Sequence, residues 1–343
     1  MKREEYAVIM GGGTALYESV VWLEFTMNQT ENQKALRGSL LLLIGSVIWG
    51  AAFAAQRAGM DHMPPFAFSG IRMLLGGFVM MPVVRLLDRH PEQNVEAAAV
   101  RKWDQRKAGL ICGLFLFAAT SLQQVGLVST SAGKAGFLTA LYVVLVPLAG
   151  LLVFRVHPGR IIWIGVGLAV AALYLLCVPA AGFRVEPGDL LLIGCAVCFT
   201  GQILGVDRYA PKVNGAALAR DEFLVTGVLS MIVALCTEKI AWEGIREALI
   251  PILYTGILSS AVGYSLQIFG QRDVNPTVAS LLMCLESVFA VTTGALILGE
   301  TMTSREILGS LLMFTAVILA QLPPVIENRA KEKAARNRSP AQL

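Results

Sequence analysis

The chain has 343 residues, of which 55% are hydrophobic and only 15% are charged. A soluble domain carries about 25% charged residues because its surface must face water, so this composition excludes an ordinary soluble protein. The net charge of +4 does not indicate nucleic-acid binding, because the basic residues lie between apolar runs, where membrane topology places them.

The first 37 residues carry several glutamates among apolar residues and lack the basic segment and cleavage site of a signal peptide. We expect residues 1–37 to form an N-terminal leader. Met27 is a candidate for the native start, because the residues after it are an ordinary polar approach to the first apolar run.

Ten apolar runs follow, each about as long as a helix that spans ~30 Å of hydrocarbon. Because the bilayer core holds no water, backbone groups must be hydrogen-bonded within each segment, which favours helices. Pro147 lies inside the fourth run and is expected to kink it. Residues 325–343 are expected to form a cytoplasmic tail, in which the polar stretch Arg329–Arg338 lacks regular structure. The predicted spans lie at about 38–56, 66–84, 109–128, 133–154, 160–179, 188–206, 219–236, 248–269, 276–298 and 305–323.

Basic residues are distributed unevenly between the segments that separate these spans. With both termini inside, 21 Lys and Arg residues lie in segments that face the cytoplasm, and 6 lie on the opposite side. Because cytoplasmic segments of membrane proteins are enriched in Lys and Arg, this distribution predicts a multi-pass inner (plasma) membrane protein with both termini in the cytoplasm.

The second half of the chain repeats the first. At an offset of 150 residues, Trp49 matches Phe199 and Gly77 matches Gly227. At an offset of 144 residues, the Ser-Leu-Gln at 121–123 matches the one at 265–267 and opens a long ungapped match. The change of offset falls in loops, so each half holds five spans.

An odd number of spans per half forces the two halves into opposite orientations. We therefore predict an all-α membrane protein with ten transmembrane helices in two inverted five-helix repeats, at residues 38–180 and 187–324. Inverted repeats recur in secondary transporters, which bind their substrates near the membrane midplane between the halves. This step carries the interpretation from membrane protein to transporter.

Three stretches resemble the EamA branch of the drug/metabolite transporter superfamily. They are IWGAAF at 48–53, the stretch 122–147, and the stretch 263–303, which contains the family's Gly-Glu ending at Gly299-Glu300. The first repeat has Arg155-Val156 at the matching positions, so this ending is present once. The resemblance extends over about residues 38–323. It implies ten helices around a central cavity and the export or exchange of small metabolites.

Ionisable residues deep within a span cost several kcal/mol unless they are paired or hydrated, so they are functional candidates. Glu286 lies ~15 Å along its helix from Pro276, near the midplane, and would bind a proton or a cationic group. Arg72 lies ~10 Å from the start of its span and suits an anionic substrate group. The structural alternatives are an ion pair between these two, a hydrogen bond from Glu286 to a neighbouring helix, and extension of the Arg72 side chain to the interface. Glu222 matches Arg72 at the offset of 150, but its place nearer the end of a span favours an interfacial role.

Uncharged polar residues and one lysine complete the candidate site. Gln123 and Gln267 occupy matching positions, with Tyr264 nearby, and either line a polar path or cross-link helices. Trp49 lies in mid-span, away from the interface where tryptophan is usual, and either stacks on substrate or packs against a neighbouring helix. Lys134 begins the fourth span and is either a second cation of the site or extends to the interface.

These features predict a secondary transporter that works by alternating access, with Arg72 binding substrate charge and Glu286 supplying proton linkage. The substrate is expected to be an amino acid, a related small metabolite or a drug. We expect membrane lipid as a partner, no nucleic acid, no cofactor and no metal; whether the chain forms a homodimer stays open. A channel or a non-transporting scaffold is the main alternative. An intramembrane enzyme is disfavoured, because the three histidines lie in separate loops and no HExxH pattern occurs.

Overall fold

The computed structural model describes residues 33–87, 95–130, 132–155, 157–178, 186–298 and 302–337, without the side chains of residues 87, 95–102, 132–134, 154, 294–298 and 322–337. Met27 with most of the predicted leader, the Gly299-Glu300 pair, Val156 and the Lys134 side chain lie outside this description.

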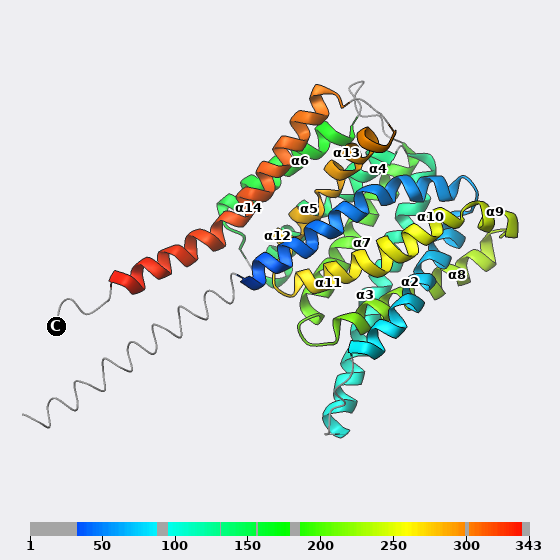
Figure 1. The fold of residues 1–343 in the computed structure, drawn as a ribbon, viewed down its shortest axis with the longest axis horizontal. Coiled ribbons are helices and arrows are strands. Elements are labelled where there is room, and N and C mark those ends of the chain that lie inside the picture. Colours follow the sequence, from blue (N-terminus) through cyan, green and yellow to red (C-terminus); the bar gives the residue numbers. More distant parts are fainter. Residues whose placement is uncertain are drawn as a thin grey trace, which may run out of the picture.

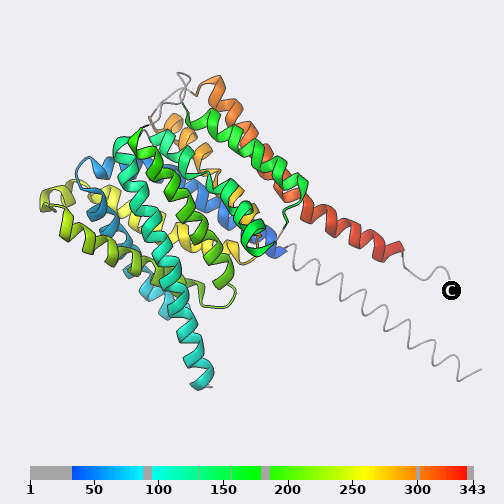
Figure 2. The same cartoon turned by 180° about the vertical axis from the view of Figure 1, so that it is seen from behind.

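Every regular element in the described ranges is a helix, and the long helices run alongside one another in one bundle (Figures 1 and 2). The first of them is Gln33–Met60. The others are α2 (Pro65–Leu87), α3 (Val95–Ser129), α4 (Ala132–Thr139), α5 (Tyr142–Phe154), α6 (Arg160–Cys177), α7 (Pro187–Tyr209), α8 (Gly215–Thr237), α9 (Trp242–Glu247), α10 (Leu249–Leu253), the π-helix η1 (Tyr254–Tyr264), α11 (Ser265–Gln271), α12 (Pro276–Met283), α13 (Glu286–Leu298) and α14 (Ser304–Asn337).

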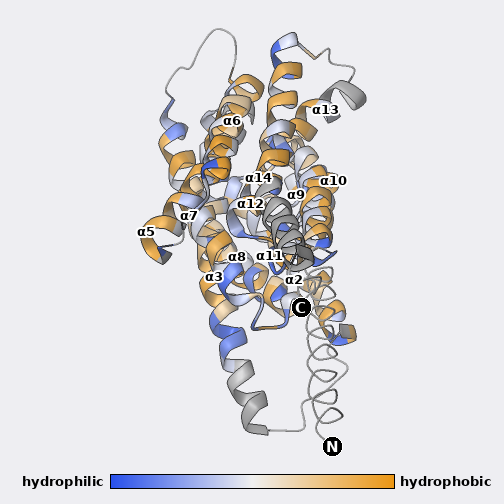
Figure 3. Cartoon of the chain, turned by 90° about the vertical axis from the view of Figure 1, so that its left-hand side faces the viewer, coloured by the Kyte–Doolittle hydropathy of each residue, from blue (hydrophilic) through white to orange (hydrophobic). Residues whose placement is uncertain are grey.

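Nine helical segments in the described ranges are long and apolar enough to cross a membrane, and Figure 3 shows apolar residues along most of their length. Helix α8 is not among them and carries Arg220, Asp221 and Glu222 in its first half. It packs along the spanning helix α2 more extensively than any other described pair of elements. Helix α8 therefore runs alongside a candidate span, which supports the tenth span predicted at this place.

The element boundaries repeat with the offsets found in the sequence. Helices α2 and α8 begin and end 150 residues apart. Helices α4 and α12 begin and end 144 residues apart, and so do α5 and α13. The predicted duplication is therefore confirmed for these three pairs of helices.

Contacts between α2 and α8 show that the two repeats are inverted. Leu74 lies against Gly227, and Gly77 lies against Leu224. As the residue number rises along α2, the number of its contact falls along α8, so these equivalent helices run antiparallel. The predicted inverted orientation follows directly.

Other repeated glycines mark equivalent crossings. The backbones of Gly38 and Gly270 meet, and so do those of Gly126 and Gly188. The first span of each half thus packs against the third span of the other half. Residues without a side chain allow backbones to approach this closely, as is usual in membrane helix bundles.

The fourth and ninth spans, predicted as continuous helices, are each broken once. Helix α4 gives way to α5 at Ala140 and Leu141, and α12 gives way to α13 at Cys284 and Leu285. Both breaks are tightened turns, in which the N–H of Leu141 or Leu285 donates to the carbonyl three residues earlier. The two breaks meet, because the Cys284 thiol donates to the Ala140 carbonyl at 3.8 Å. Such mid-span turns often mark functional hinges.

The fourth span does not break at Pro147, where a kink was predicted. The break lies before it, and Pro147 sits inside the continuous helix α5. The matching residue of the second repeat is Val291, yet that repeat breaks at the equivalent place. The break is therefore a shared feature of the two repeats that does not depend on the proline.

The C-terminal tail also differs from expectation. Helix α14 continues to Asn337, so much of the segment predicted to lack structure is helical. Its Ala, Lys, Glu and Arg residues are strong helix formers, and this local preference outweighed the polarity that suggested disorder.

Two groups of loops define the ends of the bundle. At one end, the backbone N–H of Asn214 donates to the Gln105 side chain at 3.0 Å, which brings the start of α3 to the turn before α8. At the other end, Glu238 after α8 accepts from the N–H groups of Phe66 and Ala67 at 3.0 and 2.8 Å. A carboxylate at this helix N-terminus is favourable, because the N-terminus carries partial positive charge.

Candidate functional site

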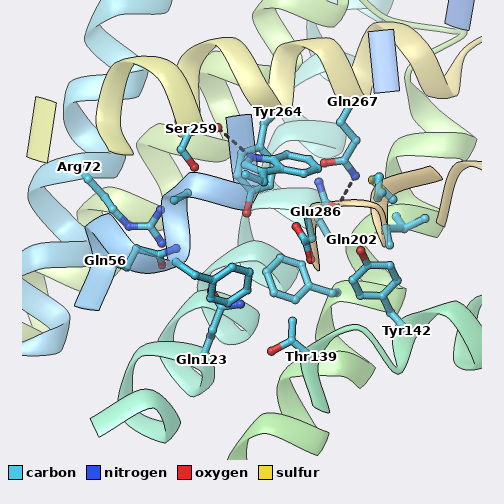
Figure 4. Close-up of a pocket in the computed structure, with 16 residues that line it drawn as sticks. Gln56, Arg72, Gln123, Thr139, Tyr142, Gln202, Ser259, Tyr264, Gln267 and Glu286 are labelled. Carbon is cyan, nitrogen blue, oxygen red and sulfur yellow. Dashed lines mark hydrogen bonds between the residues drawn. The ribbon is translucent and has the colours of Figure 1, made fainter. Parts of the chain in front are cut away.

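A cavity lies between the two halves of the bundle, bordered by both broken spans (Figure 4). The centres of water molecules can occupy about 60 Å³ of it. This volume holds several waters, since one water molecule needs ~10–15 Å³. Its lining residues are Trp49, Ala52, Phe53, Gln56, Arg72, Gln123, Thr139, Tyr142, Phe199, Gln202, Ile203, Ser259, Tyr264, Gln267, Met283 and Glu286.

The structure brings six of the seven candidate residues to this one cavity. Arg72 comes from α2 and Glu286 from the first turn of α13, while Lys134 is the candidate whose side chain lies outside the description. The remaining four are Trp49 of the first described helix, Gln123 of α3, Tyr264 of η1 and Gln267 of α11.

Most of the lining follows the repeat. Twelve of the sixteen lining residues form six pairs at the offsets of 150 and 144, so each half supplies the same six positions. The pairs are Trp49 with Phe199, Ala52 with Gln202, Phe53 with Ile203, Gln123 with Gln267, Thr139 with Met283, and Tyr142 with Glu286. The cavity therefore sits on the pseudo-symmetry axis, and its chemistry comes from positions where the pairs differ.

Arg72 and Glu286 are the charged residues of the cavity. Their side chains are almost fully buried, with residue exposures of 2% and 7%. The ion pairs found among the described residues are His62–Glu247 and Arg220–Asp221, so Arg72 and Glu286 do not pair with each other. The Arg72 Nε is buried without a hydrogen-bond partner in this part of the chain.

Buried unpaired charges of this kind are costly unless something else compensates them. The cavity beside Arg72 and Glu286 is where a compensating group fits. No ion pair joins Arg72 and Glu286 among the described residues, so that structural alternative is removed.

Carboxamides form the polar wall of the cavity. Gln267 Nε2 donates to Gln202 Oε1 at 3.1 Å and to Gln271 Oε1 at 2.9 Å. Gln202 Nε2 in turn donates to the Glu222 carboxylate at 3.4 Å. The predicted role of Gln267 in cross-linking helices and its place at the cavity therefore coexist, because one side chain does both.

Aromatic rings form the apolar wall. Trp49 packs edge-on against Tyr264 with ring centres 5.1 Å apart, and its indole N–H donates to the Ser259 carbonyl at 3.1 Å. Tyr142 packs edge-on against Phe199 at 6.5 Å. Trp49 and Phe199 also border both large buried apolar clusters of the bundle, so the rings are held by the core and face the cavity.

Three lining residues with clear chemistry were missed by sequence reasoning. Tyr142 lines the same cavity as Glu286 (Figure 4), and the sequence offered a signal for it, because it is the repeat partner of that residue. Gln202 is the partner of the featureless Ala52, and Gln56 has Val206 as its partner, so the repeat points to neither. In the described residues, no group of three or more His, Cys, Asp and Glu suits a metal ion.

Two successive segments, residues 36–178 and 186–322, each match the model of the EamA-like transporter family. The chain belongs to that family. The two matched segments are the two halves of the EamA bundle, and the membership confirms that the protein is a transporter and not an enzyme.

Relatives of this EamA transporter cover most of its length. An uncharacterized transporter of Archaeoglobus fulgidus is 29% identical over 85% of this chain and 88% of its own length. The uncharacterized inner membrane transporter YedA of Escherichia coli K12 is 25% identical over 84% and 90%. The threonine/homoserine exporter RhtA of the same strain is 29% identical over 54% of this chain and 61% of its own.

Proposed function

We propose that this multi-pass EamA transporter carries a zwitterionic small metabolite of the amino-acid class across the inner membrane, by export or exchange. The observation that carries the proposal is the pair of opposite charges, Arg72 and Glu286, which face one buried cavity and do not pair with each other within the described residues. A guanidinium binds a carboxylate through two parallel hydrogen bonds, and a carboxylate binds an ammonium group. An α-amino acid supplies both partners in one molecule.

The rest of the cavity suits the same ligand. The electron-rich faces of Trp49 and Tyr264 favour a cation nearby. The carboxamide of Gln123 offers donors and an acceptor, and Gln267 offers its oxygen, because its nitrogen already donates to Gln202 and Gln271. The name of the E. coli relative points the same way, because threonine and homoserine are zwitterionic amino acids.

Alternating access requires contacts at both ends of the cavity that open in turn. At one end, Arg57 donates to the Leu127 carbonyl at 2.8 Å. At the other, Arg272 donates to the Ala210 and Val213 carbonyls at 2.8 and 2.6 Å. These links join the ends of the first and third spans in one half and of the corresponding spans in the other, so inverted halves carry equivalent closures.

Counterflow into proteoliposomes tests the proposal. Vesicles are preloaded with individual amino acids, beginning with threonine and homoserine, and the uptake of the radiolabelled amino acid is measured. We expect saturable uptake that depends on the preloaded compound. Uptake that neither saturates nor depends on preloading would indicate a channel, and no uptake with any amino acid would contradict the proposed substrate class.

Two substitutions in the cavity and two control substitutions test whether Arg72 and Glu286 bind the substrate. Arg72→Gln and Glu286→Gln are each expected to lower saturable uptake at least ~10-fold, because a hydrogen bond to a charged group contributes about 1.5–3 kcal/mol. Arg246→Gln and Glu243→Gln remove the same charges from the exposed end of the bundle and should leave uptake unchanged. Equal losses in all four variants would overturn the assignment.

A further inference from the structure

We propose that Glu222 binds the proton exchanged for the substrate, and that Gln202 carries its protonation state to the cavity wall. The inference rests on the proposed transport function. It assigns two tasks to different groups. Arg72 and Glu286 bind the charges of the substrate in the cavity, and Glu222 binds the proton behind the Gln202 side chain of the cavity wall.

Glu222 is fully buried, at 0% exposure, which corrects the interfacial role expected from its position. Its Oε2 accepts from Gln202, but its Oε1 is buried without a partner among the described residues. An ionised carboxylate with an unsatisfied buried oxygen is costly. Uptake of a proton removes the charge, so this geometry suits a group that alternates between acid and carboxylate.

The elements around Glu222 bring little charge to it. The titratable groups that interact with it electrostatically are Cys112 of α3 and Tyr264 of η1. Helix α7 contributes the neutral Gln202. Neither of the ion pairs found in the described residues includes Glu222, and Arg72 of α2 is not bonded to it. Within the part of the chain that the structure describes, no neighbouring cation therefore holds this carboxylate in its charged form.

The hydrogen bonds from Glu222 form a chain with one direction. Gln202 donates to Glu222 and accepts from Gln267, and Gln267 also donates to Gln271. Gln271 Nε2 ends the chain on the Ile203 carbonyl at 3.3 Å. An ionised carboxylate only accepts hydrogen bonds, so it holds the Gln202 amide with its nitrogen toward Glu222.

Protonation changes what Gln202 faces. A carboxylic acid donates one hydrogen bond, and the charge that strengthened the bond from Gln202 is gone. Gln202 is then free to turn its oxygen toward Glu222 and its nitrogen toward Gln267. The Gln267 amide turns with it, so that its oxygen accepts from Gln202 and its nitrogen faces the cavity, in place of the present bonds from Gln267 Nε2 to Gln202 and Gln271. Because Gln202 and Gln267 both line the cavity, the wall presents donors in place of acceptors to the substrate. The proton itself comes from water on one side of the membrane and returns to water on the other.

Comparison of the two repeats supports this separation of tasks. Arg72 is the repeat partner of Glu222, and Ala52 is the partner of Gln202. Where the first half has the small Ala52, the charged side chain of α2 reaches the cavity itself. Where the second half has Gln202, the charged side chain of α8 stays behind it and is bonded to it.

Infrared difference spectra of the full-length protein between acidic and alkaline buffer test the proton site without any substrate. Glu222→Gln is expected to abolish a carbonyl band of a protonated carboxyl group that Glu286→Gln and Glu243→Gln retain. Gln202→Leu should keep this band but lose the accompanying change in glutamine amide bands. Glu222→Asp keeps a carboxyl and should move the band, which covers the case in which Glu222→Gln does not fold. A band that survives in Glu222→Gln, or that vanishes in Glu286→Gln, would overturn the assignment.

Transport supplies the second measurement. If one proton is exchanged for each substrate molecule, a gradient of one pH unit supports up to ~10-fold accumulation, because one unit equals 1.36 kcal/mol. Glu222→Gln should keep saturable counterflow but lower this accumulation ratio to about one. Accumulation that persists in Glu222→Gln would overturn the inference while the transport function stands. If the wild type shows no saturable flux, the transport proposal fails, and the infrared result still decides the proton site.

Discussion

Tyr142 stands where the two halves differ most in chemistry. It occupies the position in the first repeat that Glu286 occupies in the second, each at the first residue after a helix break. The two side chains face the same space, with the Tyr142 hydroxyl able to donate to the Glu286 carboxylate. We therefore expect the phenol to orient the group that we assign to the substrate ammonium.

Replacing Tyr142 with Phe removes this donor and keeps the ring. A neutral hydrogen bond contributes about 0.5–1.5 kcal/mol, so the apparent affinity for the transported amino acid should fall ~2–10-fold in counterflow, while the maximal rate changes little. Tyr174→Phe, on a ring away from the cavity, serves as the control. An unchanged affinity in Tyr142→Phe would show that Glu286 is oriented by other groups.

At the residue scale, the sequence predicted the charged residues of the site more readily than the uncharged polar residues that line it. Arg72 and Glu286 stood out because ionisable residues are rare inside apolar runs. Gln202 and Gln56 did not, because an uncharged amide within an apolar run is common and its direction depends on the rotation of a helix. The hydrogen bond from Gln202 to Glu222 depends on the placement of α7 against α8, which no local pattern encodes.

At the scale of the helices, packing of α2 against α8 depends on glycine. A Cβ added to Gly227 would lie 2.8 Å from the Leu74 backbone nitrogen, a contact that only separation of the helices relieves. Gly227→Ala should therefore lower the unfolding temperature in detergent, with a loss of ~1–3 kcal/mol typical of overpacking.

Gly167 supplies the matched control for this substitution. It lies in α6, where an added Cβ meets nothing within 4 Å. Gly167→Ala should leave stability unchanged or raise it by up to ~1 kcal/mol, because Ala is the better helix former. If both variants unfold at the wild-type temperature, the close approach of α2 and α8 contributes nothing to stability.

The helices themselves follow from length, apolar composition and local caps, whereas their irregularities do not. Asn275 caps α12 through the Thr277 N–H, as its position before Pro276 predicts. The breaks at Ala140 and Cys284 have no Gly or Pro to announce them. The two spans meet at these points, where the Cys284 thiol donates to the Ala140 carbonyl. A tertiary contact of this kind is not visible within either span alone.

At the scale of the whole molecule, the two halves share one helical framework, and the chemistry of the site comes from positions at which their residues differ. The equivalent glycine crossings require both halves to keep the same backbone. Within that frame the charges are placed unequally, with Arg72 from the first half and Glu222 and Glu286 from the second. A symmetric cavity with an asymmetric set of charges fixes the orientation of a zwitterion and gives the two directions of transport different chemistry.

The inverted arrangement also makes a prediction about sidedness. The hydrogen bond between Asn214 and Gln105 places the start of α3 and the turn before α8 at one end of the bundle, and the excess of basic residues assigns that end to the cytoplasm. Single cysteines at Lys107 and Lys212 should therefore react with a membrane-impermeant maleimide only after the cells are permeabilised. Cysteines at Asp61 and Lys239, which are exposed at the other end, should react in intact cells.

The labelling requires a background in which the six native cysteines are replaced by alanine and which unfolds at the wild-type temperature. Its outcomes separate two claims. Labelling of all four positions with the reverse pattern would leave the bundle intact and invert only its orientation, since the basic residues would then have been misread. Labelling of Lys107→Cys and Lys212→Cys from opposite sides would mean that α2 and α8 do not run antiparallel, and the cavity between inverted halves would lose its basis.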